Sequence, residues 1–237
     1  MEKREEKELK ELKPPEKNPT MKRVYAYLMQ KRHISREILS YFAKTGTLYE
    51  STEHHNIVFA GLDKEGKIRH IHIKGTCSDG RSFRLNEEGS DSSYGFGYRG
   101  GGNRLYVFEA PIDLLSFLTL YPHKWQENSY ITLNGVSEHA MLQALKDNTK
   151  LDTVNIKQLQ STYKDWNEDL KNRCGEEAIP AQEHPKMQEC RTWIEVLKKV
   201  TETIGTKYAD KAYICRYYQE IYEELKKGRS KEQVTDA

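Results

Sequence analysis

The feature that most constrains this chain is an alternation of short apolar strands and helices in residues 104–156. The expected order is strand 104–108, helix 111–121, strand 129–133, helix 137–147 and strand 153–156. Helices between successive strands are typical of a parallel sheet, because parallel strands need long crossover connections. The sequence therefore predicts a parallel α/β sheet in this half of the chain.

The preceding part of the chain shows two other patterns. Residues 21–44 carry apolar side chains at helical spacing, and Ser35 is a good N-cap for the second of two short helices. From residue 47 the apolar period changes to two. This change predicts strands at 47–50, 56–61 and 67–74. The last two strands flank a turn at residues 63–66, so we expect an antiparallel hairpin.

Residues 75–103 are rich in glycine, serine and aspartate, which predicts an exposed loop or a domain junction. Gly100, Gly101 and Gly102 precede a strand rather than following one. A phosphate-binding loop has the opposite order, so we interpret these glycines as a flexible linker.

The charge balance excludes one class of nucleic-acid-binding protein. The 237 residues include 38 Lys and Arg and 36 Asp and Glu, for a net charge of +2. This excludes a uniformly basic coat but permits a local basic patch. No apolar run approaches the roughly 18 residues of a membrane span, and the first residues lack the apolar core of a secretory signal. The four cysteines are not closely spaced, so we expect reduced thiols, a cytoplasmic protein and no membrane partner.

Two carboxylates stand where the first strand of the α/β half ends. Glu109 follows the apolar strand directly, and Asp113 comes four residues later, about one helical turn on. Ligands and catalytic groups collect at the carboxyl edge of open α/β sheets, and two carboxylates there suit Mg²⁺. The alternative is a pair of acids that stabilise the helix N-terminus through its dipole.

Several short motifs occur together in this chain. They are Tyr25-x₆-Arg32, Tyr49-Glu50, His55-Asn56-x-Val58-Phe59-x-Gly61, Lys74-Gly75-Thr76, Gly89-Ser90-Asp91 and residues 164–170, Lys-Asp-Trp-Asn-Glu-Asp-Leu. With these motifs, residues 105–133 resemble the start of a Toprim domain, the metal-binding fold of bacterial primases, topoisomerases and nucleases. Residues 22–76 resemble the domain of unknown function that precedes Toprim in proteins of bacterial mobile elements. The resemblance covers about residues 22–195.

The resemblance implies a site with more than one acid. The family's strand-end glutamate, matching Glu109, acts in acid–base transfer or as a metal ligand, and a second strand ends in an Asp-x-Asp that binds the metal. This sequence contains no Asp-x-Asp. Residues 152–156 run straight into 157–165, which look like the family's following strand and loop, so we expect a shortened sheet. Glu109 remains as the expected catalytic residue, and Glu109, Asp113 and Asp165 as the expected metal ligands for Mg²⁺.

The resulting fold class is an α+β N-terminal region with an antiparallel hairpin, then a shortened α/β Toprim-like parallel sheet, then a C-terminal helical hairpin. We expect four parts. They are a charged tail at 1–20, an α+β domain at 21–100, a truncated Toprim-like domain at 101–180 and C-terminal helices at 181–237.

Basic residues close to aromatic ones suggest contacts with nucleic acid. The expected contacts are Arg81, Arg84, Arg99, Arg104 and Lys74. Lys74 shares a strand face with His70 and His72, and we expect those histidines to be hydrogen-bonded or exposed rather than to bind zinc. Tyr94, Phe96 and Tyr98 could stack on single-stranded bases, or they could pack within a sheet.

Three functions stay open on this sequence. The first is a DNA-binding module on a degenerate Toprim scaffold, with single-stranded DNA as the favoured partner and a replication or conjugation protein as a further one. The second is a metal-dependent primase- or nuclease-like enzyme acting on DNA phosphodiesters. The third is a decayed product without activity. Dependence on divalent metal separates the first two, because electrostatic binding tolerates a chelator and weakens with salt.

Overall fold

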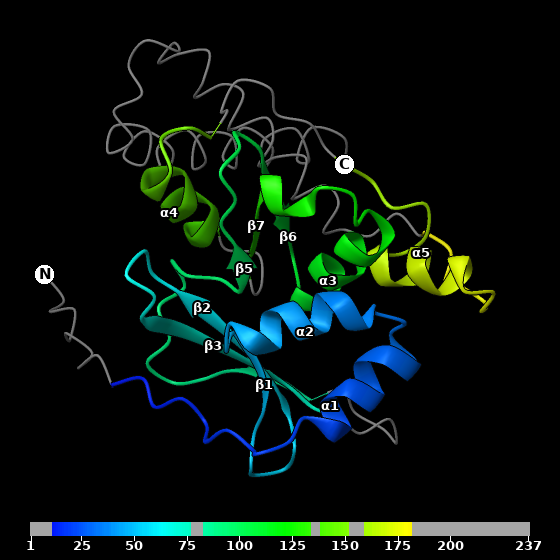
Figure 1. The fold of residues 1–237 in the computed structure, drawn as a ribbon, viewed down its shortest axis with the longest axis horizontal. Coiled ribbons are helices and arrows are strands. Elements are labelled where there is room, and N and C mark those ends of the chain that lie inside the picture. Colours follow the sequence, from blue (N-terminus) through cyan, green and yellow to red (C-terminus); the bar gives the residue numbers. More distant parts are fainter. Residues whose placement is uncertain (1–10, 77–82, 134–137, 152–158, 182–237) are drawn as a thin grey trace, which may run out of the picture.

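The structure of the protein is a computed structural model that describes residues 11–76, 83–133, 138–151 and 159–181 (Figure 1). The predicted strand at 153–156, Arg81 and nearly all of the predicted C-terminal helices lie outside the described residues. Within them the fold is a mixed α+β arrangement with two sheets, as predicted.

Short helices open the described fold, and local sequence signals explain their limits. They are α1 (Lys22–Ala26), the π-helix η1 (Tyr27–Lys31) and α2 (Arg36–Lys44). The Ser35 hydroxyl accepts a hydrogen bond of 3.3 Å from the Ile38 backbone N–H, which confirms the predicted N-cap. Gly46 follows α2 with a φ of 73°, a left-handed conformation that favours glycine.

The first sheet contains four antiparallel strands in the order β1-β2-β3-β4. Its strands are β1 (Leu48–Glu50), β2 (Ile57–Leu62), β3 (Ile68–Lys74) and β4 (Arg84–Asn86). The predicted hairpin of β2 and β3 is confirmed, and Asp63 accepts hydrogen bonds from the Glu65 and Lys67 backbone in its turn. The sequence did not predict β4, because all three of its residues are exposed and lack an apolar alternation.

The second sheet contains three strands in the order β5-β7-β6. They are β5 (Gly97–Tyr98), β6 (Leu105–Phe108) and β7 (Ser129–Thr132). The associated helices are α3 (Pro111–Leu120), the 3₁₀-helix η2 (Trp125–Glu127), α4 (His139–Asp147) and α5 (Trp166–Arg173). Strands β6 and β7 are parallel, with α3 between them in the chain, which confirms the predicted crossover. Strand β5 is antiparallel to β7, so the sheet is mixed.

The glycine-rich stretch before β6 is packed, and its interpretation as a flexible linker is wrong. A Cβ atom on Gly97 would lie 2.2 Å from the Tyr130 carbonyl oxygen, and one on Gly100 would lie 2.3 Å from that of Asn128. Among these glycines, Gly101 faces open space. Glycine is needed here because the backbone of this segment approaches β7 too closely for a side chain.

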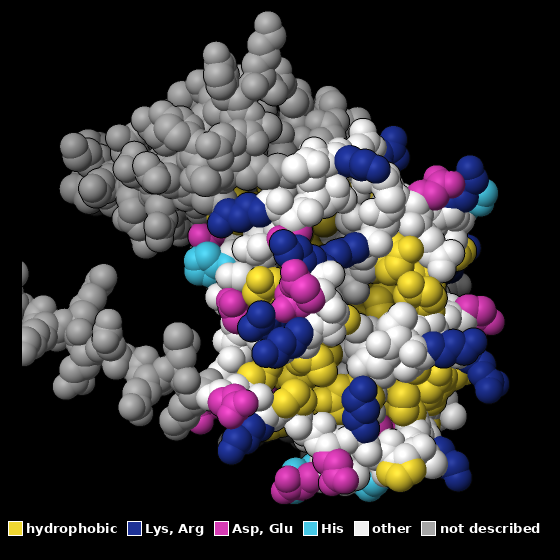
Figure 2. Space-filling view, turned by 60° about the vertical axis from the view of Figure 1, so that its left-hand side comes forward, with side chains coloured by type: hydrophobic (Ala, Val, Ile, Leu, Met, Phe, Trp, Pro, Cys, Tyr) yellow, Lys and Arg dark blue, Asp and Glu magenta, His cyan; other side chains and the backbone are white. Residues whose placement is uncertain are grey.

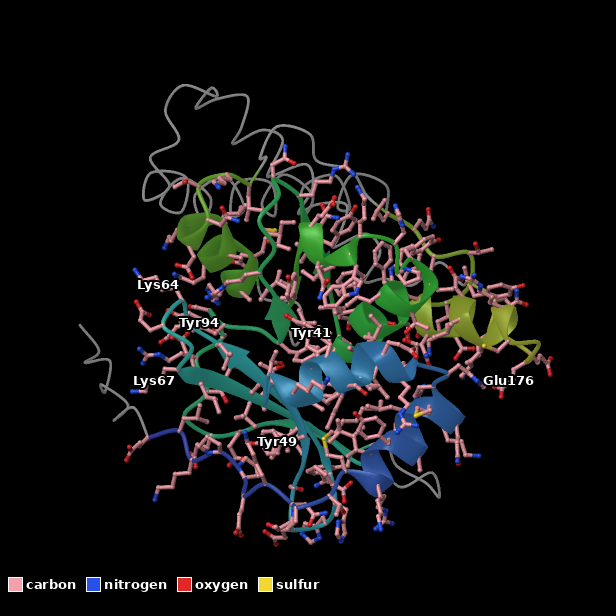
Figure 3. All side chains as sticks on the ribbon, in the orientation of Figure 1. Tyr41, Tyr49, Lys64, Lys67, Tyr94 and Glu176 are labelled. Atoms are coloured by element: carbon pink, nitrogen blue, oxygen red, sulfur yellow. The ribbon has the colours of Figure 1, made fainter. Side chains whose placement is uncertain are left out.

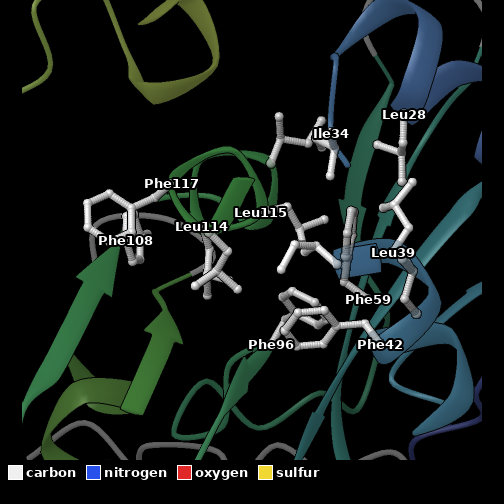
Figure 4. Packing of buried hydrophobic residues seen from close by; sticks show 14 of the residues in the cluster. Leu28, Ile34, Leu39, Phe42, Phe59, Phe96, Phe108, Leu114, Leu115 and Phe117 are labelled. Atoms are coloured by element: carbon white, nitrogen blue, oxygen red, sulfur yellow. The ribbon is translucent and has the colours of Figure 1, made fainter. Parts of the chain in front are cut away.

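One apolar core joins the two halves of the chain. It contains Phe42 and Phe59 from the N-terminal region together with Leu114 and Leu115 of α3 (Figure 4). Helix α2 packs on β1 and on α3, and α3 packs beside β6 and β7, to the right of β6 in Figure 1. Phe96 is fully buried in this core against Phe42 and Phe59, so of the two roles expected for it the structure shows packing and not base stacking.

Residues 11–20 lie along the first sheet. The Asn18 backbone N–H donates to the Glu50 carbonyl oxygen at 2.8 Å, and the Tyr49 hydroxyl, labelled in Figure 3, donates to the Pro15 carbonyl oxygen at 3.1 Å. The Lys17 ammonium lies 4.9 Å from the centre of the Tyr49 ring. This half of the expected charged tail is therefore bound to the sheet edge.

Within the described ranges, none of the helices combines the length and apolar character that a bilayer crossing requires.

Candidate acid–cation site

Three acids approach one another where β6 meets α3. Glu109 follows β6 and is exposed, and Asp113 is half-buried in the first turn of α3, which begins at Pro111. Asp165 is the N-cap of α5, where its carboxylate accepts a hydrogen bond of 2.9 Å from the Glu168 backbone N–H. Helices α3 and α5 pack against each other, so Asp165 comes close to Asp113 although 52 positions of sequence separate them.

The environment of Asp113 shows that these acids interact. The pKa of Asp113 is raised to about 7, first by burial and then by the negative charges of Asp165 and Glu109. A hydrogen bond from the Asn167 backbone and the positive charge of Arg32 act in the opposite direction. The three acids that the sequence predicted as a cluster are therefore electrostatic neighbours.

The acids do not form a closed metal site. In the described ranges, no three His, Cys, Asp or Glu side chains lie close enough together to hold a metal ion. Mg²⁺ commonly takes only one or two protein carboxylates, with waters and substrate phosphates as its other ligands. The predicted Mg²⁺ site therefore stays a prediction, and no reaction step through a metal is derived.

Positive charge from the N-terminal region faces these acids. Lys74 at the end of β3 is paired across the sheet with Arg84 of β4. Burial lowers the pKa of Lys74, as do the charges of Arg32 and Arg84, whereas Asp113 raises it. Lys74, Arg84 and Arg32 thus form, with the three acids, the acid–cation site.

Arg32 is the functional candidate that the sequence analysis missed. It appeared there only as the last residue of a motif, with no role. Its Nε and Nη2 donate to the Tyr27 hydroxyl at 3.1 and 2.9 Å, and its Nη1 donates to the Asn167 side-chain oxygen at 3.1 Å. The sequence around Arg32 does not predict its role, because its partner Asn167 lies 135 residues away in sequence.

Two of the predicted nucleic-acid contacts lie elsewhere. Arg99 donates to the Leu62 carbonyl oxygen at 3.0 Å and to the Asp147 carboxylate at 3.3 Å. Arg104 immediately precedes β6, whereas Glu109 immediately follows it, so the two residues stand at opposite ends of that strand. Lys74 is an electrostatic neighbour of Asp113 and is paired with Arg84, whereas Arg81 is outside the described residues.

The histidines of β3 have ordinary partners. His70 is buried with its Nδ1 3.2 Å from the Asp91 carbonyl oxygen, and the Nδ1 of His72 lies 2.7 Å from the Asn86 side-chain oxygen. Burial lowers the pKa of both imidazoles. Both histidines are therefore hydrogen-bonded, one of the two roles expected from the sequence.

A cavity of about 540 Å³ lies away from the acids, between the β2–β3 turn, β5, β7 and α4. Its lining includes Tyr41, Lys64 and Tyr94, labelled in Figure 3. On the face shown in Figure 2, basic and acidic side chains are interspersed, with apolar surface between them. This face of the described residues therefore offers no continuous basic patch.

Two family models match the chain. Residues 26–102 match "Protein of unknown function (DUF3991)", and residues 106–156 match "Toprim-like". These matches confirm the predicted resemblance, in which a Toprim-like region follows its associated domain. The Toprim-like match ends at residue 156, within the segment where the sequence analysis expected the sheet to be shortened.

Known proteins are similar to this chain at a distance. An uncharacterized protein of Bacillus anthracis, pXO2-78, is 26% identical over 120 residues, which cover 48% of this chain and 35% of that protein. The primase fragment of the bacteriophage T7 primase-helicase protein is 16% identical with a TM-score of 0.40, covering 62% of this chain and 68% of that chain. The DnaG catalytic core is 14% identical with a TM-score of 0.38, covering 86% and 85%. Likeness at this level says nothing about activity.

Proposed function

We propose that this protein binds single-stranded DNA at the acid–cation site, as a nucleic-acid-binding module on a degenerate Toprim-like scaffold. The observation that carries the proposal is that Lys74 and Arg84 of the first sheet and Arg32 form one group of interacting cations near Asp113. Basic side chains supply the affinity for phosphates that is common to nucleic-acid-binding proteins. A role in a bacterial mobile element, beside a replication or conjugation protein, is part of the same proposal.

The acids favour a second candidate function, a metal-dependent enzyme acting on DNA phosphodiesters. Its support is the interaction of Asp113 with Glu109 and Asp165, because a bound cation relieves the repulsion between neighbouring carboxylates. In this function Glu109 and Asp165 would contribute oxygen ligands, while the phosphates of DNA would complete the metal's coordination. We rank it second because the described acids do not gather as a ligand set.

The test is fluorescence anisotropy of a labelled single-stranded DNA oligomer, titrated at low and moderate salt with Mg²⁺ or EDTA. Binding that weakens with salt and is indifferent to EDTA supports the binding module. Binding that needs Mg²⁺ and is lost in Glu109→Gln supports the enzyme. No binding under any condition overturns both functions.

A decayed gene product is the remaining alternative. It predicts a broad unfolding transition, whereas the shared core predicts one cooperative transition for the described regions. Urea unfolding followed by both circular dichroism and tryptophan fluorescence separates these outcomes.

A further inference from the structure

We infer that Arg32 is the residue of the acid–cation site that contacts DNA phosphate, and that Tyr27 and Asn167 are positioning residues that fix its guanidinium group. The inference rests on the proposed function, because it names the group that receives the phosphate. It does not depend on a bound metal.

Arg32 stands where the charges of the site meet. Its positive charge acts on Asp113, on Lys74 and on Glu168. Its side chain is half-buried, so solvent screens these interactions less than on an open surface. Arg32 is therefore an electrostatic neighbour both of the acids of α3 and α5 and of the lysine of the first sheet.

The guanidinium group is held in one orientation. The π-helix η1 places Tyr27 and Arg32, five residues apart, in contact, with the guanidinium carbon 5.4 Å from the centre of the Tyr27 ring. Three hydrogen bonds to Tyr27 and Asn167 use one N–H on each guanidinium nitrogen. Each terminal nitrogen carries a second N–H, and arginine uses such pairs to bind phosphate oxygens. A side chain that is already ordered loses less conformational freedom on binding.

Asn167 ties this cation to the acids. The residue is 2% exposed, and its side-chain amide nitrogen donates to the Arg32 carbonyl oxygen at 2.8 Å and to the Ser116 hydroxyl at 3.0 Å. Its backbone N–H bonds the Asp113 carboxylate. One residue therefore fixes the main chain and side chain of Arg32 and also contacts an acid, which sets the spacing between positive and negative charge.

The experiment is a double-mutant cycle of Arg32→Lys and Tyr27→Phe, with single-stranded DNA binding measured by fluorescence anisotropy in EDTA. Arg32→Lys keeps the charge but loses the fork of donors, so we expect about tenfold weaker binding. Tyr27→Phe removes only the hydroxyl that holds the guanidinium, so we expect about threefold weaker binding. Because Tyr27 acts through Arg32, its substitution has no further effect in the Arg32→Lys background.

Two matched controls separate positioning from general damage. Arg36→Lys makes the same exchange at the exposed start of α2, and Tyr25→Phe removes a hydroxyl that lies 3.2 Å from that of Ser40. Both controls bind DNA as the wild type does. Thermal unfolding of every variant shows whether it is folded, and Tyr27→Phe still tests the inference if Arg32→Lys unfolds.

The outcomes distinguish this inference from the proposed function. If the wild type binds DNA and Arg32→Lys binds equally well, the inference is wrong and the proposed function stands. An undiminished effect of Tyr27→Phe in the Arg32→Lys background overturns the positioning role. If the wild type does not bind DNA, both the inference and the proposed function fail.

Discussion

Two buried carboxylates of the first sheet, Glu50 and Asp63, and Asp113 of the Toprim-like half have opposite surroundings. In the first sheet, Glu50 accepts hydrogen bonds from the Arg23 and Val24 backbone and therefore caps α1. Asp63 caps the β2–β3 turn, and the hydrogen bond from Arg69 lowers its pKa. In the Toprim-like half, burial and then the charges of Asp165 and Glu109 raise the pKa of Asp113 to about 7. Acids of the first kind stabilise the fold, whereas Asp113 destabilises it while it is ionised, which is typical of functional sites.

The largest expected effect tests the stabilising kind of acid. Glu50→Ala leaves the first turn of α1, the Asn18 amide and His55 without their acceptor, and we expect a loss of about 3 kcal/mol in the free energy of unfolding. Urea denaturation measures it. Glu53→Ala, at an exposed carboxylate nearby, changes stability by less than about 0.5 kcal/mol. Equal losses in the two variants would contradict the structural role of Glu50.

The next effect concerns β5, which lies in the chain between the two halves. Gly97→Ala brings a methyl group against the Tyr130 carbonyl oxygen, and we expect a loss of about 2 kcal/mol from overpacking. Gly101→Ala is the matched control, because a Cβ there meets no atom within 4 Å. Thermal unfolding measures both. If Gly97→Ala is as stable as Gly101→Ala, the close approach of β5 to β7 is wrong.

The third effect has the opposite sign and depends on pH. The folded-state pKa of Asp113, about 7, lies above its unfolded value of about 3.9, so the wild type loses stability as pH rises from about 4 to about 7. Asp113→Asn removes this loss. In EDTA we expect it to be about 2 kcal/mol more stable than the wild type at pH 8 and equally stable near pH 4.

Urea denaturation at both pH values measures that difference. Glu127→Gln, at an exposed acid of η2, serves as the control and shows no comparable dependence on pH. A gain of stability that is the same at pH 4 and pH 8 would show that ionisation of Asp113 does not destabilise the fold.

The smallest effect separates Lys74, at the end of β3 near Asp113, from Arg104, at the start of β6. Lys74→Gln weakens single-stranded DNA binding about threefold and reduces the slope of log affinity against log salt by about 0.7. Arg104→Gln, at the start of β6, leaves both quantities unchanged. Anisotropy titrations at several salt concentrations measure them. The reverse result would place the DNA at the start of β6.

Local signals were sufficient for much of this fold. The Ser35 cap, the β2–β3 turn and the strand–Pro111–helix junction each depend on neighbours in sequence, and the structure contains all three. The glycines in residues 95–102 were wrongly interpreted because a glycine-rich segment usually indicates a flexible chain. Glycine is needed there because the segment lies close to β7 and the residues before it, a long-range contact that the sequence does not show.

The candidate site was predicted only in part for the same reason. The strand-end rule brought Glu109 and Asp113 to one edge, and the family motif added Asp165. Arg32 escaped notice because its importance depends on Asn167 and Asp113, which other elements bring to it. Arg99 resembled a nucleic-acid contact in sequence, but its guanidinium bonds Asp147 and the Leu62 carbonyl oxygen.

The bond between Arg32 and Asn167 also determines when the site can exist during synthesis. A ribosome completes the first sheet early, yet the guanidinium must wait for a partner made 135 residues later. Domains generally fold in the order of their synthesis, so the Arg32 guanidinium of the nascent chain lacks its bond to Asn167 until α5 emerges. A prematurely terminated product that lacks α5 would thus hold a folded hairpin without an oriented phosphate contact, and it would bind DNA more weakly than the full chain.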